Sequence, residues 1–186
     1  MTAALITGPA SEPVSLAEAK AFLRVEHGDD DDVIAALTAS ARIHVEAQTR
    51  RALITQTWRL VLDCWPASGR IEVRPAPLRS LSAARGFDAD GNAEPLDLDA
   101  FVQDTAGSTL AFPSWAMVQP DRIAAGIELD VSVGYGGAAI DVPEPLRQAI
   151  RLLLAHWYEH RGITGDASTM PLSVPALLAP YRMVAL

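Results

Sequence analysis

The pattern of hydrophobic and polar residues changes twice along the chain. Apolar residues recur at helical spacing over residues 14–53, alternate in short, turn-bounded runs over residues 54–142, and return to helical spacing from residue 143. A stripe that recurs every three to four residues predicts an amphipathic helix, whereas alternation predicts a strand with one buried face. The pattern therefore predicts an α+β fold. We expect helices from 14–53 and 143–161 to form a bundle, with a small antiparallel β-sheet or sandwich inserted between them.

The first helical block begins with a capping box. Ser15 and Glu18 stand three residues apart, so each side chain can accept a hydrogen bond from the backbone N–H of the other residue. A second helix is expected from Asp31 to about Leu53, after an acidic run at 29–32 that suits a helix N-terminus. The run lacks the alternating ligands and the distal glutamate of a calcium loop. The residues expected to face the core are Val33, Ile34, Leu37, Ala41, His44 and Val45.

The two ends of the chain are expected to lie outside the packed domain, which the pattern assigns to residues 14–172. Residues 1–13 are predicted to be flexible. Residues 173–186 carry apolar side chains but are interrupted by Pro175 and Pro180, which disfavour a self-sufficient helix. This segment is predicted to be an extended tail that is mobile until it binds a partner. The alternative is that it packs back on its own domain.

Composition narrows the function. The chain has 186 residues and a net charge of −8, and its 15 Lys and Arg residues are scattered, which argues against a nucleic-acid surface as the main function. No apolar run approaches the length that spans a bilayer, so no membrane partner is expected. Cys64 is the only cysteine, which favours a reducing cytoplasm, and we expect it to pack in an apolar strand.

The segment HWYEHR contains the H-x-x-E-H motif of inverted zinc proteases. His156 and His160 are one helical turn apart and could bind the same ion. Such a site needs a third protein ligand on another element, and the only acidic residue after His160 is Asp166, in the adjoining loop. We therefore interpret the segment as a helix end and expect no metal. A metal-dependent hydrolase that uses His156, Glu159 and His160 remains the alternative.

A second motif, the glycine-rich run that starts at Gly134, lacks the Gly-Lys-Ser/Thr ending of a phosphate-binding loop and does not open a helix directly. No Cys/His pairing suits nucleophilic catalysis. We therefore expect no catalytic residue, no cofactor and no enzymatic activity.

An ordered series of short motifs resembles the head–tail connector proteins, or adaptors, of tailed phages and gene transfer agents. The pattern Ala-Arg…Glu…Thr-x-Arg…Leu…Gln-Thr is matched by Ala41, Arg42, Glu46, Thr49, Arg51, Leu53, Gln56 and Thr57. Later matches are Pro75-Ala76-Pro77-Leu78, Gly134-Tyr135-Gly136 with Pro143 and Pro145 beyond it, Tyr158-Glu159-His160-Arg161, and Pro171 with Leu177, Leu178, Tyr181 and Arg182.

The resemblance implies a structural protein at the head–tail interface of a virion or phage-like particle, made in the bacterial cytoplasm. Such connectors form a ring, usually twelvefold, beneath the portal protein and pass the DNA channel on to a stopper or tail-terminator protein. DNA passes through without sequence-specific binding, which an acidic wall suits. A stopper or tail-completion protein of the same particle is a further alternative. The C-terminal segment in this family docks on the portal, which implies an interface made by Leu177, Leu178, Pro180, Tyr181, Arg182, Val184 and Leu186.

Overall fold

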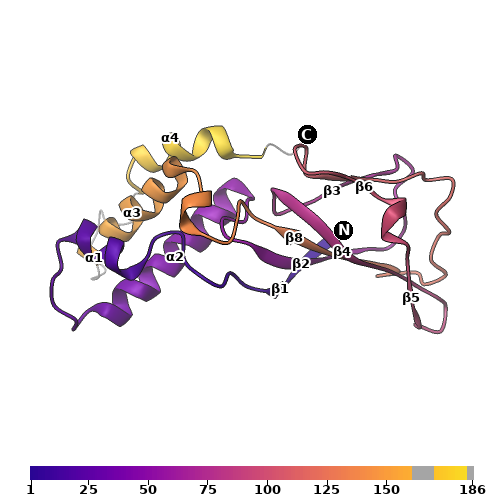
Figure 1. Cartoon of the computed structure of the whole chain (residues 1–186), viewed down its shortest axis with the longest axis horizontal. Helices are drawn as coiled ribbons and strands as arrows, with labels where there is room; N and C mark the ends of the chain where they lie inside the picture. The colour runs from indigo at the N-terminus through magenta and orange to yellow at the C-terminus, as the bar shows by residue number, and fades with distance from the viewer. Residues whose placement is uncertain (161–169, 184–186) are drawn as a thin grey trace. The chain divides into compact units, whose positions relative to one another are not determined.

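The chain folds into two compact units. The computed structural model describes residues 1–160 and 170–183 (Figure 1). Residues 1–9 and 55–135 make a β unit, and residues 10–54 together with the described residues from 136 onward make a helical unit. This mixture of helices with antiparallel sheets confirms the predicted α+β class. The sequence predicts a β insertion made by residues 54–142 alone, whereas the observed β unit also contains residues 1–9.

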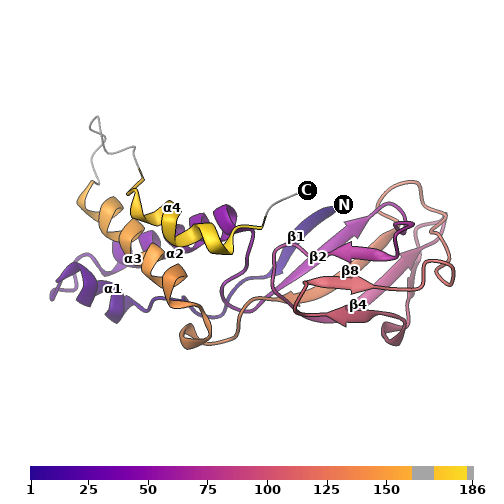
Figure 2. The same cartoon turned by 90° about the horizontal axis from the view of Figure 1, so that it is seen from above.

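The helical unit begins as the sequence predicts. The Ser15 hydroxyl accepts a hydrogen bond from the Glu18 backbone N–H at 3.2 Å, and the Glu18 carboxylate accepts one from the Ser15 backbone N–H at 2.9 Å, which confirms the capping box. The elements of the unit are α1 (Leu16–Leu23), α2 (Asp31–Thr49), η2 (Ala139–Asp141), α3 (Glu144–Glu159), α4 (Ser173–Leu178) and η4 (Ala179–Tyr181). Figure 2 shows α4 (yellow) alongside α3 (orange), and α4 also contacts α2.

The buried face of α2 differs from the predicted one. Ile34, Ala41 and Val45 are buried as expected, but Val33 is 39% exposed and Leu37 and His44 are only half-buried. Thr38 and Thr49 complete the buried stripe instead. Their hydroxyls donate hydrogen bonds of 2.7 Å to the carbonyls of Ile34 and Val45 respectively, so these polar groups are buried without losing a partner. The buried apolar residues that α3 and α4 contribute are Leu146, Ala149, Ile150, Leu153, Leu154, Val174 and Leu178.

The β unit contains two antiparallel sheets. The larger sheet has the strand order β1-β2-β8-β4-β5, and the smaller has the order β3-β7-β6. The strands are β1 (Thr2–Thr7), β2 (Gln56–Leu62), β3 (Arg70–Glu72), β4 (Leu78–Phe87), β5 (Ala93–Pro95), β6 (Val102–Asp104), β7 (Thr109–Ala111) and β8 (Ile127–Val133), with the short helix η1 (Leu98–Ala100) before β6. In Figure 1 the smaller sheet runs beside one face of the larger sheet.

Alternation along the strands places apolar side chains on one face, as the sequence predicts. Leu60 on β2 pairs with Leu129 on β8, and both are fully buried. Beyond the end of β2, Trp65 packs against Phe101 and Phe112, with ring centroids 5.9 and 4.9 Å away. Cys64, expected to pack in a strand, is exposed in the bend that follows β2. The strand ends before it, so its side chain is not part of the core.

The N-terminal segment also differs from its prediction. Residues 1–13 are predicted to be flexible, but Thr2–Thr7 forms β1, which pairs antiparallel with β2. Long-range pairing supplies the backbone hydrogen bonds that a six-residue apolar segment cannot supply locally. Across residues 1–160 and 170–183, no helix is both long and apolar enough to span a membrane.

Candidate functional site

The motif residues around the end of α2 form one polar cluster. The Arg42 guanidinium is nearly buried and donates hydrogen bonds to Glu12 at 2.8 Å and to Glu46 at 2.7 Å. The Glu46 carboxylate also accepts a hydrogen bond of 2.9 Å from the backbone N–H of Leu53. Arg50 ends the helix in the left-handed conformation, with φ of 56°. Arg42 and Glu46 therefore fix the turn by which the chain leaves α2.

The C-terminal segment is held against this turn. Arg51 Nε donates a hydrogen bond of 2.7 Å to the backbone carbonyl of Tyr181, and the Met183 N–H donates one of 3.3 Å to the carbonyl of Thr49. A further contact with α2 joins two side chains, since the Arg182 guanidinium donates a hydrogen bond of 3.1 Å to the Gln48 side-chain carbonyl. Two motifs far apart in the sequence thus meet at one place in the helical unit.

The predicted tail is not extended over its described part. Residues 173–181 are helical, and Val174 and Leu178 have no exposed surface. Pro175 lies in the first turn of α4, where the backbone N–H that proline lacks has no partner within the helix. The two aliphatic side chains stand one turn apart and fill the core beside α2 and α3. Of the alternatives that the sequence left open, packing on the chain's own domain is the one observed for this part.

The seven residues predicted to dock on a partner have different environments. Leu178 is buried within its own unit and is unavailable to a partner in this conformation. Leu177 and Tyr181 are half-buried, whereas Pro180 and Arg182 are exposed. Val184 and Leu186 lie outside the described residues. The surface that a partner could contact at the end of η4 is therefore smaller than the seven-residue interface predicted from the sequence.

Local packing explains both glycines of the Gly134-Tyr135-Gly136 motif. Gly134 has a φ of 118° and donates a hydrogen bond of 2.9 Å to the Pro77 carbonyl, so the glycine motif contacts the Pro-x-Pro-Leu motif within the β unit. Gly136 lies against the Asp141 carboxylate, which would stand 2.0 Å from a β-carbon at that position. A positive φ accounts for Gly134 and the close approach of the Asp141 side chain accounts for Gly136.

The H-x-x-E-H segment lies at the end of α3. The rings of His156 and His160 are 4.6 Å apart, and His160 Nδ1 lies 2.8 Å from the His156 carbonyl. Glu159 and His160 are exposed. Within the described residues, no three His, Cys, Asp or Glu side chains are grouped so that they could hold a metal ion. Asp166, the downstream acid considered as a third ligand, lies outside those residues.

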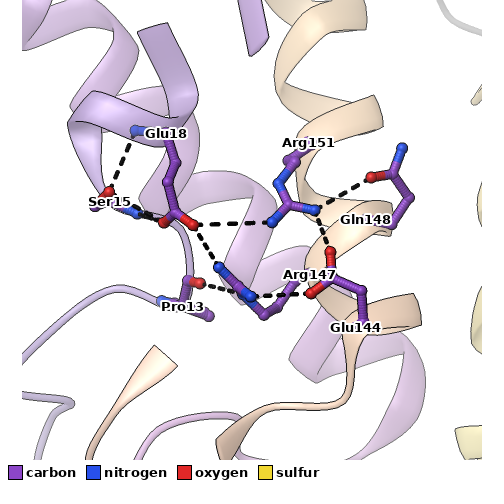
Figure 3. Close-up of polar contacts among 7 residues, drawn as sticks. All are labelled: Pro13, Ser15, Glu18, Glu144, Arg147, Gln148 and Arg151. Carbon is purple, nitrogen blue, oxygen red and sulfur yellow. Dashed lines mark hydrogen bonds and ion pairs between the residues drawn. The ribbon is translucent and has the colours of Figure 1, made fainter. Parts of the chain in front are cut away.

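Sequence reasoning missed a cluster of charges that joins α1 to α3 (Figure 3). Arg147 is 9% exposed, and its guanidinium donates to Glu18 at 2.6 Å, to Glu144 at 2.9 Å and to the Pro13 carbonyl at 2.9 Å. Arg151 also donates to Glu144. The Ser15 backbone N–H and then Arg147 hold the pKa of Glu18 below its usual value, and Arg151 does the same for the pKa of Glu144. The i, i+3 spacing of Glu144 and Arg147 was the available signal.

A second charge network lies across the larger sheet. Arg59 on β2 and Arg85 on β4 both donate hydrogen bonds to Asp130 on the strand between them, at 2.7 and 2.8 Å. Glu128, two residues before Asp130, lies 3.2 Å from Arg59 and 3.5 Å from Arg85. Hydrogen bonds from Arg59 first, and then from Arg85, lower the pKa of Asp130. Both arginines are neutralised within the sheet, so the network orders strands and presents no free positive site.

Solved structures resemble the chain over its whole length. A chain in the neck of an empty GTA (gene transfer agent) particle, computed with C6 symmetry, has a TM-score of 0.85 and 27% sequence identity, and the match covers 100% of this chain and 97% of that one. A chain in the virion of a native gene transfer agent particle has a TM-score of 0.82 and 26% identity, and one in the neck of a native particle, computed with C12 symmetry, has 0.81 and 26%, with the same coverages. No protein-family model and no curated protein matches the chain. The predicted resemblance to head–tail connector proteins is confirmed.

Proposed function

We propose that this protein is a structural head–tail connector, an adaptor that forms a ring beneath the portal of a phage-like particle and continues the DNA channel towards the tail. The observation that carries the proposal is the full-length likeness to chains of gene transfer agent necks, at a TM-score of 0.85 and 27% identity. Both units are covered, so the likeness extends beyond one common supersecondary motif. The proposal places the protein at the head–tail interface.

The symmetry of the similar particles supports a ring of identical subunits. Necks containing similar chains were computed with C6 and with C12 symmetry. A cyclic ring is built from one head-to-tail interface that is repeated until it closes. The net charge of −8 suits a channel protein, because an acidic surface repels the DNA phosphates and lets the duplex move.

The C-terminal segment is proposed as the portal-docking element, with Leu177, Pro180, Tyr181, Arg182, Val184 and Leu186 as its contact residues. Support comes from how the segment is held. Arg51 binds the Tyr181 carbonyl, so the aromatic side chain is carried on an anchored backbone. Aromatic and arginine side chains dominate the energetics of many interfaces, and Tyr181 is followed by the exposed Arg182. Leu178 acts in this proposal by fixing α4 and not by touching the portal.

Deleting the gene in a particle-producing strain tests the function. We expect DNA-filled or emptied heads that carry a portal but no tail, with tailed particles restored by the wild-type gene in trans. Heads that still join to tails in its absence would contradict a connector role. If tails join but DNA leaks from the heads, the protein is a stopper or tail-completion protein instead.

A further inference from the structure

The loop of residues 113–125, between β7 and β8, displays large apolar side chains to solvent. Trp115 is 89% exposed, Val118 is 88% exposed and Ile123 is 96% exposed. The loop contains no helix or strand. Loops of this length without secondary structure are uncommon in compact domains and are often functional. Three such side chains on one loop are therefore unusual for a surface that stays in water.

This loop is fixed in place by Trp65. The Trp65 indole N–H donates a hydrogen bond of 3.0 Å to the Val118 carbonyl. The Gln119 side chain accepts one from the Trp65 backbone N–H at 2.9 Å and donates one to the Trp65 carbonyl at 3.2 Å. Trp65 itself is 4% exposed. At the end of the loop the Ala125 N–H donates to Asp63 at 2.8 Å.

The anchoring explains how the apolar side chains stay exposed. The polar contacts that hold the loop are made by its backbone and by Gln119, and the three apolar side chains stay exposed to solvent. A docking surface that is already ordered loses less conformational freedom on binding than a flexible one. The arrangement is that of an interaction loop.

The charge around the loop indicates the chemistry of its partner. Residues 86–125 contain seven acidic residues and one basic residue, Arg122. The loop adjoins the acidic turn after β4, because the Arg122 guanidinium lies 5.4 Å from the centre of the Phe87 ring and the Phe87 N–H donates to the Gly126 carbonyl at 2.9 Å. A negative rim repels DNA and favours a positively charged protein surface.

We propose that the 113–125 loop is a docking surface for a different protein of the same particle, one that offers an apolar recess bordered by Lys or Arg residues. Trp115, Val118 and Ile123 would fill the recess, and the acidic residues around them would face its rim. This inference rests on the proposed function, and it adds a contact surface on the β unit that is separate from the C-terminal segment.

The first experiment uses particles whose only copy of the chain is a variant. The combined change Trp115→Ser and Ile123→Ser should lower the yield of tailed particles about tenfold or more, as expected when interface anchors are lost. Val118→Ser should lower it less, and Val102→Ser is the matched control, because Val102 is also exposed, at 68%, but lies on β6. Wild-type yields from the double variant would overturn the proposal. Thermal unfolding of each purified variant checks that it is folded.

The second experiment identifies the occupant. A photoreactive amino acid at position 115 is activated in intact particles, and the cross-linked peptides are sequenced. We expect cross-links to a Lys- or Arg-rich peptide of another particle protein. Cross-links to DNA, to a second copy of this chain, or to nothing would each overturn the proposal. The proposed function fails separately, if the wild-type chain is absent from the necks of purified particles.

Discussion

Arg51 Nε donates a 2.7 Å hydrogen bond to the backbone carbonyl of Tyr181, which ties the residue after the α2 cap to the C-terminal segment. The two residues are 130 positions apart in the sequence. Both residues belong to motifs that resemble those of head–tail connectors, and this hydrogen bond brings the two motifs into contact. The conformation of the proposed docking segment depends on the end of α2.

Replacing Arg51 with Ala should loosen this segment. Loss of a hydrogen bond from a charged donor costs about 1–3 kcal/mol, and the effect should be local, because the core of the helical unit is unchanged. Hydrogen exchange measured by mass spectrometry should become faster in residues 179–183 and stay unchanged in α3. Arg70→Ala, at an exposed arginine on β3, is the control. Equal exchange in the Arg51 variant and in wild type would argue against the anchor.

Leu178 and Leu177 form a matched pair for testing the role of α4. Leu178 is fully buried and Leu177 is half-buried. Leu178→Ala should lower the free energy of unfolding by about 2–5 kcal/mol, and Leu177→Ala by less than about 1.5 kcal/mol. Denaturant unfolding measures both. If the two variants lose similarly small amounts of unfolding free energy, the segment is instead the mobile tail that the sequence predicted.

Acid should weaken the β unit through Asp130. Its pKa in the folded protein is lowered, mainly by the hydrogen bond from Arg59, so its contribution to stability is complete above the unfolded pKa of about 4 and is lost as the pH falls through the folded value. Asp130→Asn should cost about 1–3 kcal/mol at neutral pH. It should also make stability less dependent on pH below about pH 5.

Urea unfolding between neutral pH and about pH 3 tests this prediction. Asp121→Asn is the control, because Asp121 is exposed and no ion pair joins it to another described residue. If the free energy of unfolding depends on pH in the same way in wild type and in Asp130→Asn, the Arg59 contact does not stabilise the ionised Asp130 carboxylate.

The paired histidines of α3 are expected to bind no stoichiometric zinc. The His156 and His160 rings are tilted by 39° with centroids 4.6 Å apart, and the described residues offer no third ligand near them. Elemental analysis after dialysis should find far less than one metal per chain. One zinc per chain that disappears in His160→Ala would instead favour the hydrolase alternative.

The sequence predicted features whose causes are local. Ser15 and Glu18 satisfy each other's backbone N–H groups within one turn, so the capping box and the start of α1 follow from four residues. The alternation in β2 likewise identified a strand with one buried face. These predictions needed no knowledge of which elements meet.

Features that depend on long-range partners were missed. β1 forms only because β2 is available as a partner, and α4 forms because Val174 and Leu178 find the core of the helical unit. The burial of Thr49 was missed for a different, local reason, because its hydroxyl donates to the Val45 carbonyl one turn earlier and hydrophobicity alone does not indicate such a bond. The portal-docking role of the C-terminal residues came from resemblance, and it stays a prediction.

We propose that this chain forms the connecting ring between head and tail. A cryo-electron microscopy reconstruction of the neck of the particles that contain it is the most direct measurement. We expect a closed ring around the DNA axis, next to the portal, whose subunits fit both the helical and the β unit. Tyr181 and Arg182 should lie at the portal surface. A neck whose density fits other chains only, or a ring of this chain that does not touch the portal, would contradict it.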